Sequence, residues 1–318
     1  MRITSNNNEL DRDYDFSILT ACYNSSSSIR DVFNSLKKLQ NKNFEWIVVN
    51  DASTDNTTEI LNQILKEAEF KITLCDLEQN RMVTYCYHLG ILHSKGKFLI
   101  ILDHDDQIKS NALDRFLFHW NSLANNQQES LAGMFACCED ENGSLVGSYF
   151  PRSPDINNFF NLMFVEGMRG EKFFCYKTKI MQENNFQLVD RYVPESNVLY
   201  KISAKYKTLF FNEKLRVYTQ PQLDGNNLST TVNPFKYPVG FRLHYLDLLN
   251  NYSSQLNYMP YLLLAFLHNF SLYSCASNHN LRTCLSDLNL LSHRFLLIPI
   301  FLISRIIIII RSKSSLSY

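Results

Sequence analysis

The sequence predicts an α/β fold, a mostly parallel sheet with flanking helices, followed by a helical C-terminal region. Three observations carry this prediction. Short apolar runs rich in β-formers alternate with amphipathic stretches from Phe16 onward. Beyond Pro234 the pattern changes to long segments rich in Leu, Tyr and Phe. With 318 residues, 45% of them hydrophobic, the chain can bury a sizeable core, which excludes wholesale disorder.

Two strand–loop–helix units open the predicted fold after a polar leader, residues 1–15. Residues 16–21, FSILTA, are expected to form a buried strand. Apolar side chains then recur at three- and four-residue steps through residues 29–39, which indicates an amphipathic helix. Residues 45–49 repeat the strand, and residues 60–68 repeat the helix. Such βαβ units predict parallel strands joined by right-handed crossovers.

Further elements extend this pattern along the chain. They are strands at 71–75, 97–102, 133–138, 145–149, 173–177 and from Leu209, and helices at 85–93, 111–123, 195–205 and 258–273. Ligands bind beyond the carboxyl ends of parallel strands. The polar loops TACYN, NDASTDNT and DHDD all fall at those ends, so we expect the functional site there.

Residues 295–310 form the most apolar run of the chain, with thirteen strongly apolar residues and one charge, Arg305. A spanning helix needs about 20 apolar residues, so this run is expected to be too short to cross a membrane. Basic residues flank it at Arg294 and Arg311. The run therefore favours a helix lying in a membrane interface, and a core helix or an oligomer contact is the alternative.

Composition narrows the possible partners and compartment. Lys+Arg 31 and Asp+Glu 31 balance, with a pI near 7.1, so no global field attracts nucleic acid. The eight cysteines lack CxxC or Cys/His spacing, which indicates reduced thiols instead of disulfides or a zinc site. The N-terminus has no apolar signal stretch, so we expect a cytoplasmic location, peripheral at the membrane.

Three carboxylates crowd the end of the strand at 97–102. Asp103 and Asp105 share one face of an extended segment, and Asp106 turns away. Carboxylates this close raise one another's pKa unless a cation or backbone donors relieve the repulsion. A divalent ion with oxygen ligands is one solution, with His104 more a solvent-facing spacer than a ligand. The alternative is an acidic turn that caps the helix at 111–123.

The loop NDASTDNT supplies two more carboxylates at the same edge, Asp51 and Asp55. Asp51 could accept hydrogen bonds from a nucleobase or a ribose. Capping of the next helix by Asp55 or Thr57 is the alternative, and both can hold together.

The segments FSILTACYNSSSSIRDVFNSL, WIVVNDASTDNTTEIL and GKFLIILDHDD, spaced by about thirty and fifty residues, resemble the inverting glycosyltransferases of family 2, which have the GT-A fold. Weaker similarity at 166–178, 193–218 and 223–229 resembles bacterial members that build surface polysaccharides. The resemblance implies a nucleotide-sugar-binding half at 16–130 and an acceptor-binding half at 131–233, with a separate helical region at 234–318. It also implies a nucleotide-sugar donor, favouring a UDP-sugar, and a glycan or lipid-linked glycan acceptor.

The resemblance assigns roles to particular residues. It places the nucleoside beside Thr20, Tyr23 and Asp51, and it places Mn²⁺ or Mg²⁺ on the diphosphate at the three aspartates of the acidic turn, Asp103, Asp105 and Asp106. It makes Glu195 the base that takes the acceptor proton, with Glu171 second and Asp190 a distant third.

One stretch departs from the family pattern. In NRMVTYCYHLG, Met82 stands where glycine is usual, and Val83 and Tyr87 stand at positions that are often basic. Arg81 or His88 is then the expected cation beside the diphosphate. Tyr87 itself is interpreted as ordinary helix packing.

Two other function classes compete with an active transferase. One alternative is a catalytically silent nucleotide-sugar binder or assembly protein, which would keep the fold while the segment NRMVTYCYHLG lost the residues usual in the family. A nucleotidyltransferase is disfavoured because the sequence has no Gly-rich, basic phosphate loop near its N-terminus.

Overall fold

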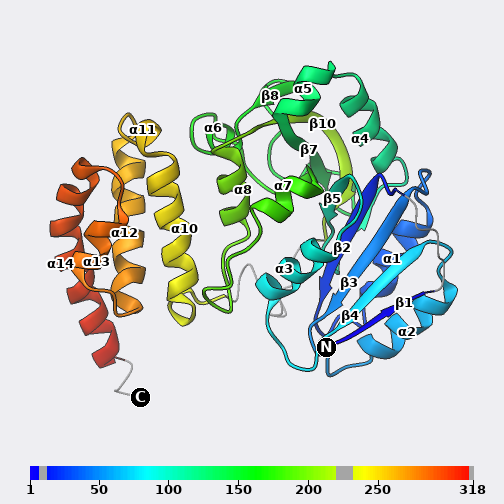
Figure 1. Cartoon of the computed structure of the whole chain (residues 1–318), viewed down its shortest axis with the longest axis horizontal. Coiled ribbons are helices and arrows are strands. Elements are labelled where there is room, and N and C mark those ends of the chain that lie inside the picture. The colour runs from blue at the N-terminus through cyan, green and yellow to red at the C-terminus, as the bar shows by residue number, and fades with distance from the viewer. Residues whose placement is uncertain (7–12, 220–231, 315–318) are drawn as a thin grey trace. The chain divides into compact units, whose positions relative to one another are not determined.

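The computed structural model describes residues 1–6, 13–219 and 232–314, which form two compact units. The first unit takes in Met1–Phe186 and Lys205–Pro221 and carries the sheet. The second takes in Gln187–Ala204 and Gln222–Tyr318 and is helical (Figure 1). The similarity noted at 223–229 lies outside the described residues.

Four parallel strands with crossover helices form the first part of the sheet, as predicted. These elements are β2 (Phe16–Cys22), α1 (Ile29–Lys37), β3 (Phe44–Asn50), α2 (Thr57–Glu67), β4 (Lys71–Asp76), α3 (Val83–His93) and β5 (Phe98–Ile101). β2 pairs in parallel with β3 and β5, and β3 pairs in parallel with β4. The loops after β2, β3 and β5 therefore share one edge of the sheet.

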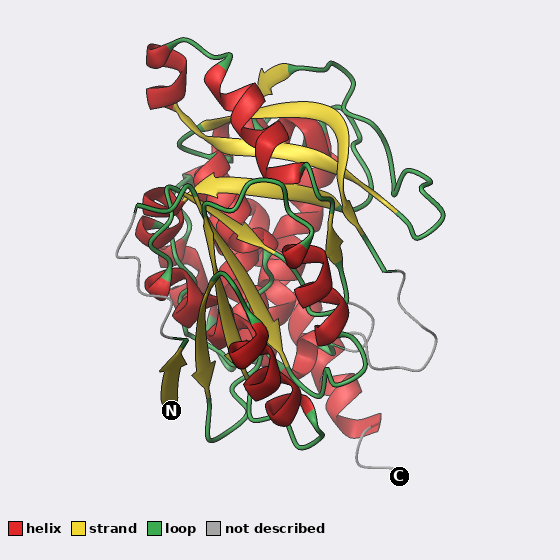
Figure 2. Ribbon diagram, turned by 90° about the vertical axis from the view of Figure 1, so that its right-hand side faces the viewer, coloured by secondary structure: helices red, strands yellow, loops and turns green. Residues whose placement is uncertain are grey.

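The rest of the sheet is mixed, so the expectation of a mostly parallel sheet holds for its first half alone. The additional elements are β6 (Gln107–Ile108), α4 (Ala112–Asn121), α5 (Asn125–Ser130), β7 (Leu131–Glu139), β8 (Asp155–Asn157), α6 (Phe159–Phe164), β9 (Lys172–Lys177), α7 (Thr178–Glu183) and β10 (Lys207–Val217). Within the described residues the order is β1-β4-β3-β2-β5-β9-β7-β10-β6, where β1 is Arg2–Ser5. Figure 2 shows these strands as a twisted sheet.

The N-terminal leader is not entirely irregular. Arg2–Ser5 form β1, which pairs antiparallel with β4 at the sheet edge. All four residues of β1 are exposed, and Ile3 is their single apolar side chain, so no hydrophobic pattern marks this strand in the sequence.

Helices cover both faces of the sheet. Ile18 and Trp46 belong to one core cluster with Phe33 of α1 and Leu61 of α2. Leu19, the next residue of β2, faces α3, where a side chain at Gly90 would collide with it. The alternation along β2 thus places one helical layer on each side.

The predicted strand at 145–149 is wrong. Leu145 makes an isolated bridge with Glu139, and the backbone then turns. Gly147 has φ +78° and lies so close to Gly170 that a side chain at either position would collide with the other's backbone. This close approach of two loops, which alternation in the sequence does not reveal, replaces the ladder.

The second unit consists of helices. Its elements are α8 (Ser196–Ser203), the 3-10 turn η1 (Pro234–Lys236), α10 (Pro238–Asn251), α11 (Ser253–Leu256), α12 (Pro260–Ala276), α13 (Leu281–Asp287) and α14 (Leu291–Ser314). Arg242 of α10 makes an ion pair with Asp287 at the end of α13, and its Nε donates to Ser274 Oγ of α12 at 3.1 Å. One buried arginine therefore joins three helices.

Candidate active site

The loops after β2 and β3 are fastened to each other by hydrogen bonds. Asn24 Oδ1 accepts from the backbone N–H of Thr54 at 2.8 Å. Asp55 Oδ2 accepts from the backbone N–H of Ser26 at 3.1 Å, and its Oδ1 accepts from that of Thr57 at 3.0 Å. Burial raises the pKa of Asp55, but the hydrogen bonds from Thr57 and Ser26 outweigh this effect and lower the pKa to about 2. Asp55 thus serves the first turn of α2 and the neighbouring loop.

Asp51 fastens the segment before α3 to the end of β3. Its side chain is buried, and its two oxygens accept the backbone N–H groups of Arg81 at 2.6 Å and Met82 at 2.8 Å. The Asp51 side chain, which is predicted to face the nucleoside, therefore already accepts hydrogen bonds from the protein backbone. Its position fixes where the following residues of the loop can lie.

The other two predicted nucleoside contacts differ in exposure. Thr20 is fully buried, and its hydroxyl accepts from the indole N–H of Trp46 at 3.0 Å. Tyr23 is 44% exposed. Of Thr20, Tyr23 and Asp51, the structure leaves Tyr23 open to solvent.

The acidic turn follows β5 at the same edge. The side chain of Asp103 is 40% exposed, and its Oδ1 accepts from the Tyr87 hydroxyl at 2.6 Å. The interpretation of Tyr87 as simple helix packing is therefore wrong, because a hydroxyl at that position of α3 reaches the turn. His104 lies with Nδ1 3.3 Å from Ser28 Oγ, against the loop after β2.

Asp106 turns inward, in the predicted direction, although residues 104 and 105 form a turn and not the extended segment that the prediction assumed. It is 1% exposed, its Oδ1 accepts from the backbone N–H of Thr219 at 2.9 Å, and its Oδ2 lies 3.2 Å from Arg216 Nε. Burial raises the pKa of Asp106 to about 7, against the opposing effect of Arg216. The resemblance counts Asp106 among the metal ligands, but both of its oxygens face protein groups. The turn does not cap α4 either, whose N-cap residue is Asn111.

Asp105 is half-buried, and burial raises the pKa of its carboxyl, with the charge of His104 acting in the opposite direction and that of Asp103 adding to it. In the described parts of the chain, no three His, Cys, Asp or Glu side chains form a ready-made metal site. Asp103 and Asp105 nevertheless fit a divalent ion of the kind that proteins hold by one or two carboxylates together with water and substrate phosphate oxygens.

Arg216, near the end of β10, lies between the acidic turn and a further carboxylate, that of Glu171. It is 4% exposed, its Nη1 lies 4.0 Å from Asp103 Oδ2, and its Nη2 lies 3.5 Å from Glu171 Oε2. Sequence reasoning missed Arg216. The available signal was an arginine inside the apolar strand at the end of LFFNEKLRVY, since a buried charge requires a partner.

Arg81 and His88, the two candidate cations of the segment NRMVTYCYHLG, differ in their exposure to solvent. Arg81 is exposed, and its guanidinium stacks 4.5 Å from the ring centre of Tyr85. His88 is half-buried, with Nδ1 3.0 Å from the carbonyl oxygen of Phe186. Arg81 is therefore the more accessible of the two.

The two remaining acids lie in the second unit. Glu195 is the N-cap residue of α8 and makes no side-chain cap hydrogen bond to it. Asp190 Oδ2 accepts the backbone N–H groups of Val239 at 3.0 Å and Gly240 at 3.1 Å, at the start of α10. Asp190 thus has an evident structural task.

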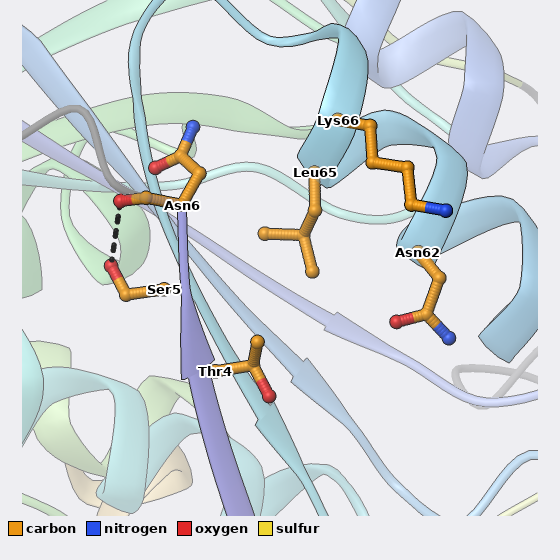
Figure 3. A pocket seen from close by; sticks show the side chains of 6 residues that line it. All are labelled: Thr4, Ser5, Asn6, Asn62, Leu65 and Lys66. Carbon is orange, nitrogen blue, oxygen red and sulfur yellow. Dashed lines mark hydrogen bonds between the residues drawn. The ribbon is translucent and has the colours of Figure 1, made fainter.

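A separate hollow of about 320 Å³ lies between β1 and α2 (Figure 3). Its lining residues are Thr4, Ser5, Asn6, Asn62, Leu65 and Lys66. Among the described residues, the lining holds no carboxylate. The hollow shares none of the residues of the acidic turn.

Comparison with known proteins places the site residues in context. Residues 17–183 match the sequence model of glycosyl transferase family 2, which covers over half of the chain. A poly-beta-1,6-N-acetyl-D-glucosamine synthase of Staphylococcus epidermidis is 36% identical over 96 residues, 30% of this chain and 23% of that protein. A teichoic acid poly(glycerol phosphate) polymerase of the same species is 26% identical over 105 residues, 33% and 15% of the two chains. The matched part thus spans about a quarter or less of these relatives.

Solved structures extend the similarity of fold. S. aureus TarS, residues 1–349 in complex with UDP-GlcNAc, aligns with a TM-score of 0.62 and 17% identity, over 90% of this chain and 79% of that one. The mannosyltransferase PcManGT of Pyrobaculum calidifontis, in complex with GDP-Man and Mn²⁺, aligns with a TM-score of 0.53 and 14% identity, over 93% and 87%. At these identities the likeness shows the fold, which confirms the GT-A-like prediction.

Proposed function

Because the chain belongs to glycosyl transferase family 2, we propose that it is a metal-dependent inverting glycosyltransferase. The proposed donor is a nucleotide sugar, with a UDP-sugar favoured, and the proposed acceptor is a lipid-linked or growing surface glycan. One observation carries the proposal: the reachable carboxylates Asp103 and Asp105 follow β5 within the matched region, at the edge where ligands bind in such sheets.

Asp103 and Asp105 are the proposed metal ligands. A Mn²⁺ or Mg²⁺ ion bound there would neutralise the departing nucleoside diphosphate. The Tyr87 hydroxyl holds Asp103 from the side of α3. Asp106 supports the turn from within, through Thr219 and Arg216.

Tyr23 and Arg81 are the proposed donor contacts from this chain. Tyr23, the first residue of the loop after β2, offers an exposed ring, and Arg81, just before α3, offers an exposed cation. Asp51 positions Arg81 by accepting its backbone N–H. Thr20 supports this edge from inside the sheet through its bond with Trp46.

Glu195 is the proposed base, and Glu171 is the second candidate. Inversion in a single displacement needs a carboxylate that takes the acceptor hydroxyl proton opposite the leaving group. Glu195→Gln should leave the binding of UDP and Mn²⁺ unchanged and lower turnover by about 10²-fold or more. Glu171→Gln is the matched variant, and a larger loss of turnover in it would transfer the role to Glu171.

Calorimetry with UDP and Mn²⁺, followed by a hydrolysis screen of UDP- and GDP-sugars, tests the function. Binding of UDP that requires Mn²⁺, together with hydrolysis of one donor, would support the transferase. Binding without hydrolysis or transfer would favour a catalytically silent nucleotide-sugar binder. The observation that motivates this alternative is Met82, which stands where the family usually has glycine. A lack of binding would overturn both.

We further propose that α14 attaches the protein to a membrane. Among the described residues, the segment Leu291–Arg311 of this helix is long and apolar enough to cross one, with mean hydropathy 2.1, and 22% of its most apolar window is buried. α14 is longer at both ends than the run 295–310 on which the sequence expectation rested.

The exposed surface of α14 matches an anionic lipid interface. Its packed side is marked by His293, Leu297, Phe301 and Ser304. Ile300 and Ile308 are half-buried. The other large apolar residues are exposed: Leu291, Phe295, Leu296, Ile298, Leu302, Ile303, Ile306, Ile307, Ile309 and Ile310. The helix sequence has four basic residues and no acid, and an exposed Arg305 in its middle favours an interfacial position over a spanning one.

Flotation of the protein with phosphatidylcholine vesicles, with and without phosphatidylglycerol, tests this attachment. We expect binding that increases with the anionic lipid and is lost in Ile306→Glu/Ile310→Glu. Binding released only by detergent would indicate a spanning helix. A protein that stays off both kinds of vesicle, or that buries this surface in a dimer, would overturn the proposal.

A further inference from the structure

We propose that Arg216 is a positioning residue that holds the metal-binding turn and Glu171 in one fixed arrangement. This inference rests on the proposed function and adds to it a division of labour among four carboxylates. Arg216 and Asp106 form an internal pair, so that Asp103 and Asp105 are left to face the cation.

The guanidinium is placed so that it contacts three acids at once. Its Nε, Nη1 and Nη2 lie 3.2, 4.0 and 3.5 Å from Asp106, Asp103 and Glu171 respectively. Its Cζ also lies over two aromatic rings, 5.7 Å from the centre of Phe173 and 5.3 Å from that of Tyr218. A planar fork of donors can do this, whereas the compact ammonium of lysine cannot.

The main chain brings this side chain to the turn. β10 pairs antiparallel with β6, the strand that follows the turn, with Arg216 opposite Ile108. Three residues after Arg216, the Thr219 hydroxyl donates to the carbonyl oxygen of Asp105 at 2.6 Å, and the Thr219 N–H donates to Asp106. The end of β10 therefore holds both the backbone and one carboxylate of the turn.

Glu171 is fixed from two directions. The buried ammonium of Lys172 donates to the carbonyl oxygens of Arg169 at 2.7 Å and Glu171 at 3.2 Å, which closes the loop before β9. Arg216 then holds the carboxylate itself. The Glu171 side chain is still 54% exposed, so a ligand can reach it while it is paired.

Asp106 and Arg216 differ from the rest of the cluster in being buried almost completely, at 1% and 4% exposed. Removing one partner of such a pair is strongly destabilising, whereas replacing both by neutral groups of similar size is often tolerated. This difference separates a positioning role from a merely structural one.

The test compares Arg216→Met, Asp106→Asn and the double variant Asp106→Asn/Arg216→Met with the unmodified chain. The two measurements are the thermal midpoint and the Mn²⁺ dissociation constant in the presence of UDP, from calorimetry. Arg115→Met is the matched control, because Arg115 pairs with Glu213 of the same strand and contacts none of the four acids.

We expect Arg216→Met to lower the midpoint and to weaken Mn²⁺ binding at least tenfold. The double variant should regain most of the midpoint but keep the weakened Mn²⁺ binding, because Asp103 and Glu171 still lack their partner. Arg115→Met should change the midpoint alone. Recovery of both quantities in the double variant, or unchanged Mn²⁺ binding in Arg216→Met, would overturn the inference while leaving the proposed function intact. If the unmodified chain does not bind Mn²⁺ with UDP, both fall.

Discussion

Two acidic loops lie at the same edge of the sheet, but their aspartates differ in how many hydrogen-bond donors surround the carboxylates. In the loop after β3, Asp51 accepts two backbone N–H groups and Asp55 accepts from Ser26 and Thr57. In the turn after β5, Asp105 is half-buried and crowded by a second carboxylate, and the pKa of its carboxyl is raised. The pKa of Asp55 is lowered instead.

The difference shows that residue type alone does not identify a site. A carboxylate whose oxygens accept several backbone N–H groups stabilises the loop around it, and its charge is already compensated. A pair of carboxylates with few such donors is a place where a cation binds favourably. The acids of the loop after β3 are therefore engaged in holding the backbone, whereas the turn after β5 is the place that we propose for the metal.

The largest expected effect comes from Asp105→Asn. Loss of this carboxylate should lower metal-dependent transfer by about 10³-fold, because stabilisation of the departing diphosphate is lost. Transfer assays over a Mn²⁺ titration measure the effect. Asp106→Asn is the matched neighbour and should keep Mn²⁺ binding within about threefold, as expected of a buried group that does not contact the ion. Equal loss in both variants would erase the distinction between the outward and inward acids.

A large effect on stability is expected from Asp51→Ala. Two backbone N–H groups would lose a buried acceptor, which should lower the free energy of unfolding by about 3 kcal/mol. Urea unfolding at neutral pH measures it. The exposed Glu69→Ala provides the baseline, with an expected change below about 0.5 kcal/mol. A loss as small as that of Glu69→Ala would show that Asp51 does not fasten the loop.

A smaller effect with a defined pH dependence is expected from Asp55→Asn. The pKa of Asp55 is about 2 in the folded chain and 3.8 in its unperturbed state. Its charge therefore stabilises the fold fully above the unperturbed value, and this contribution is lost as the pH falls through the folded value. The variant should be less stable by about 1 kcal/mol near neutral pH.

Urea unfolding of the unmodified chain and the Asp55→Asn variant at several pH values would follow this difference. It should shrink steadily below the unperturbed pKa. A difference that is independent of pH would assign the effect to packing instead of charge.

An effect of similar size and opposite sign is expected at Met82, which has φ 67° and ψ 165° at the N-cap of α3. Residues other than glycine rarely adopt this conformation, and it stores about 1–3 kcal/mol. Met82→Gly should therefore raise the free energy of unfolding by about 1 kcal/mol, after the greater chain entropy of glycine is subtracted. Thermal unfolding measures it, and a lower midpoint would show that packing of the methionine side chain outweighs the strain.

Local patterns were sufficient to predict the strands of the first half and the position of the acidic turn. The inward direction of Asp106 agrees with the prediction, but residues 104 and 105 lie in a turn and not in the extended segment on which the prediction rested, so the contacts with Thr219 and Arg216 account for it. Local patterns failed at residues 145–149, where the approach of Gly147 to Gly170 decides the backbone, and at Tyr87, whose hydroxyl contacts a residue sixteen positions away. Contacts between distant segments leave no period in the sequence.

The sequence by itself determined the family, the GT-A-like fold and the edge of the sheet at which the acids gather. Periodic burial and the order of three motifs are properties of consecutive residues, so they can be recognised before folding. The tertiary structure alone decided which acids are compensated. Arg216 reaches the turn through the pairing of β10 with β6, more than a hundred residues away along the chain, and Asp51 meets its donors through the packing of α3. A carboxylate's environment depends on such non-local neighbours, since a charge is stabilised by whatever lies within a few ångströms of it.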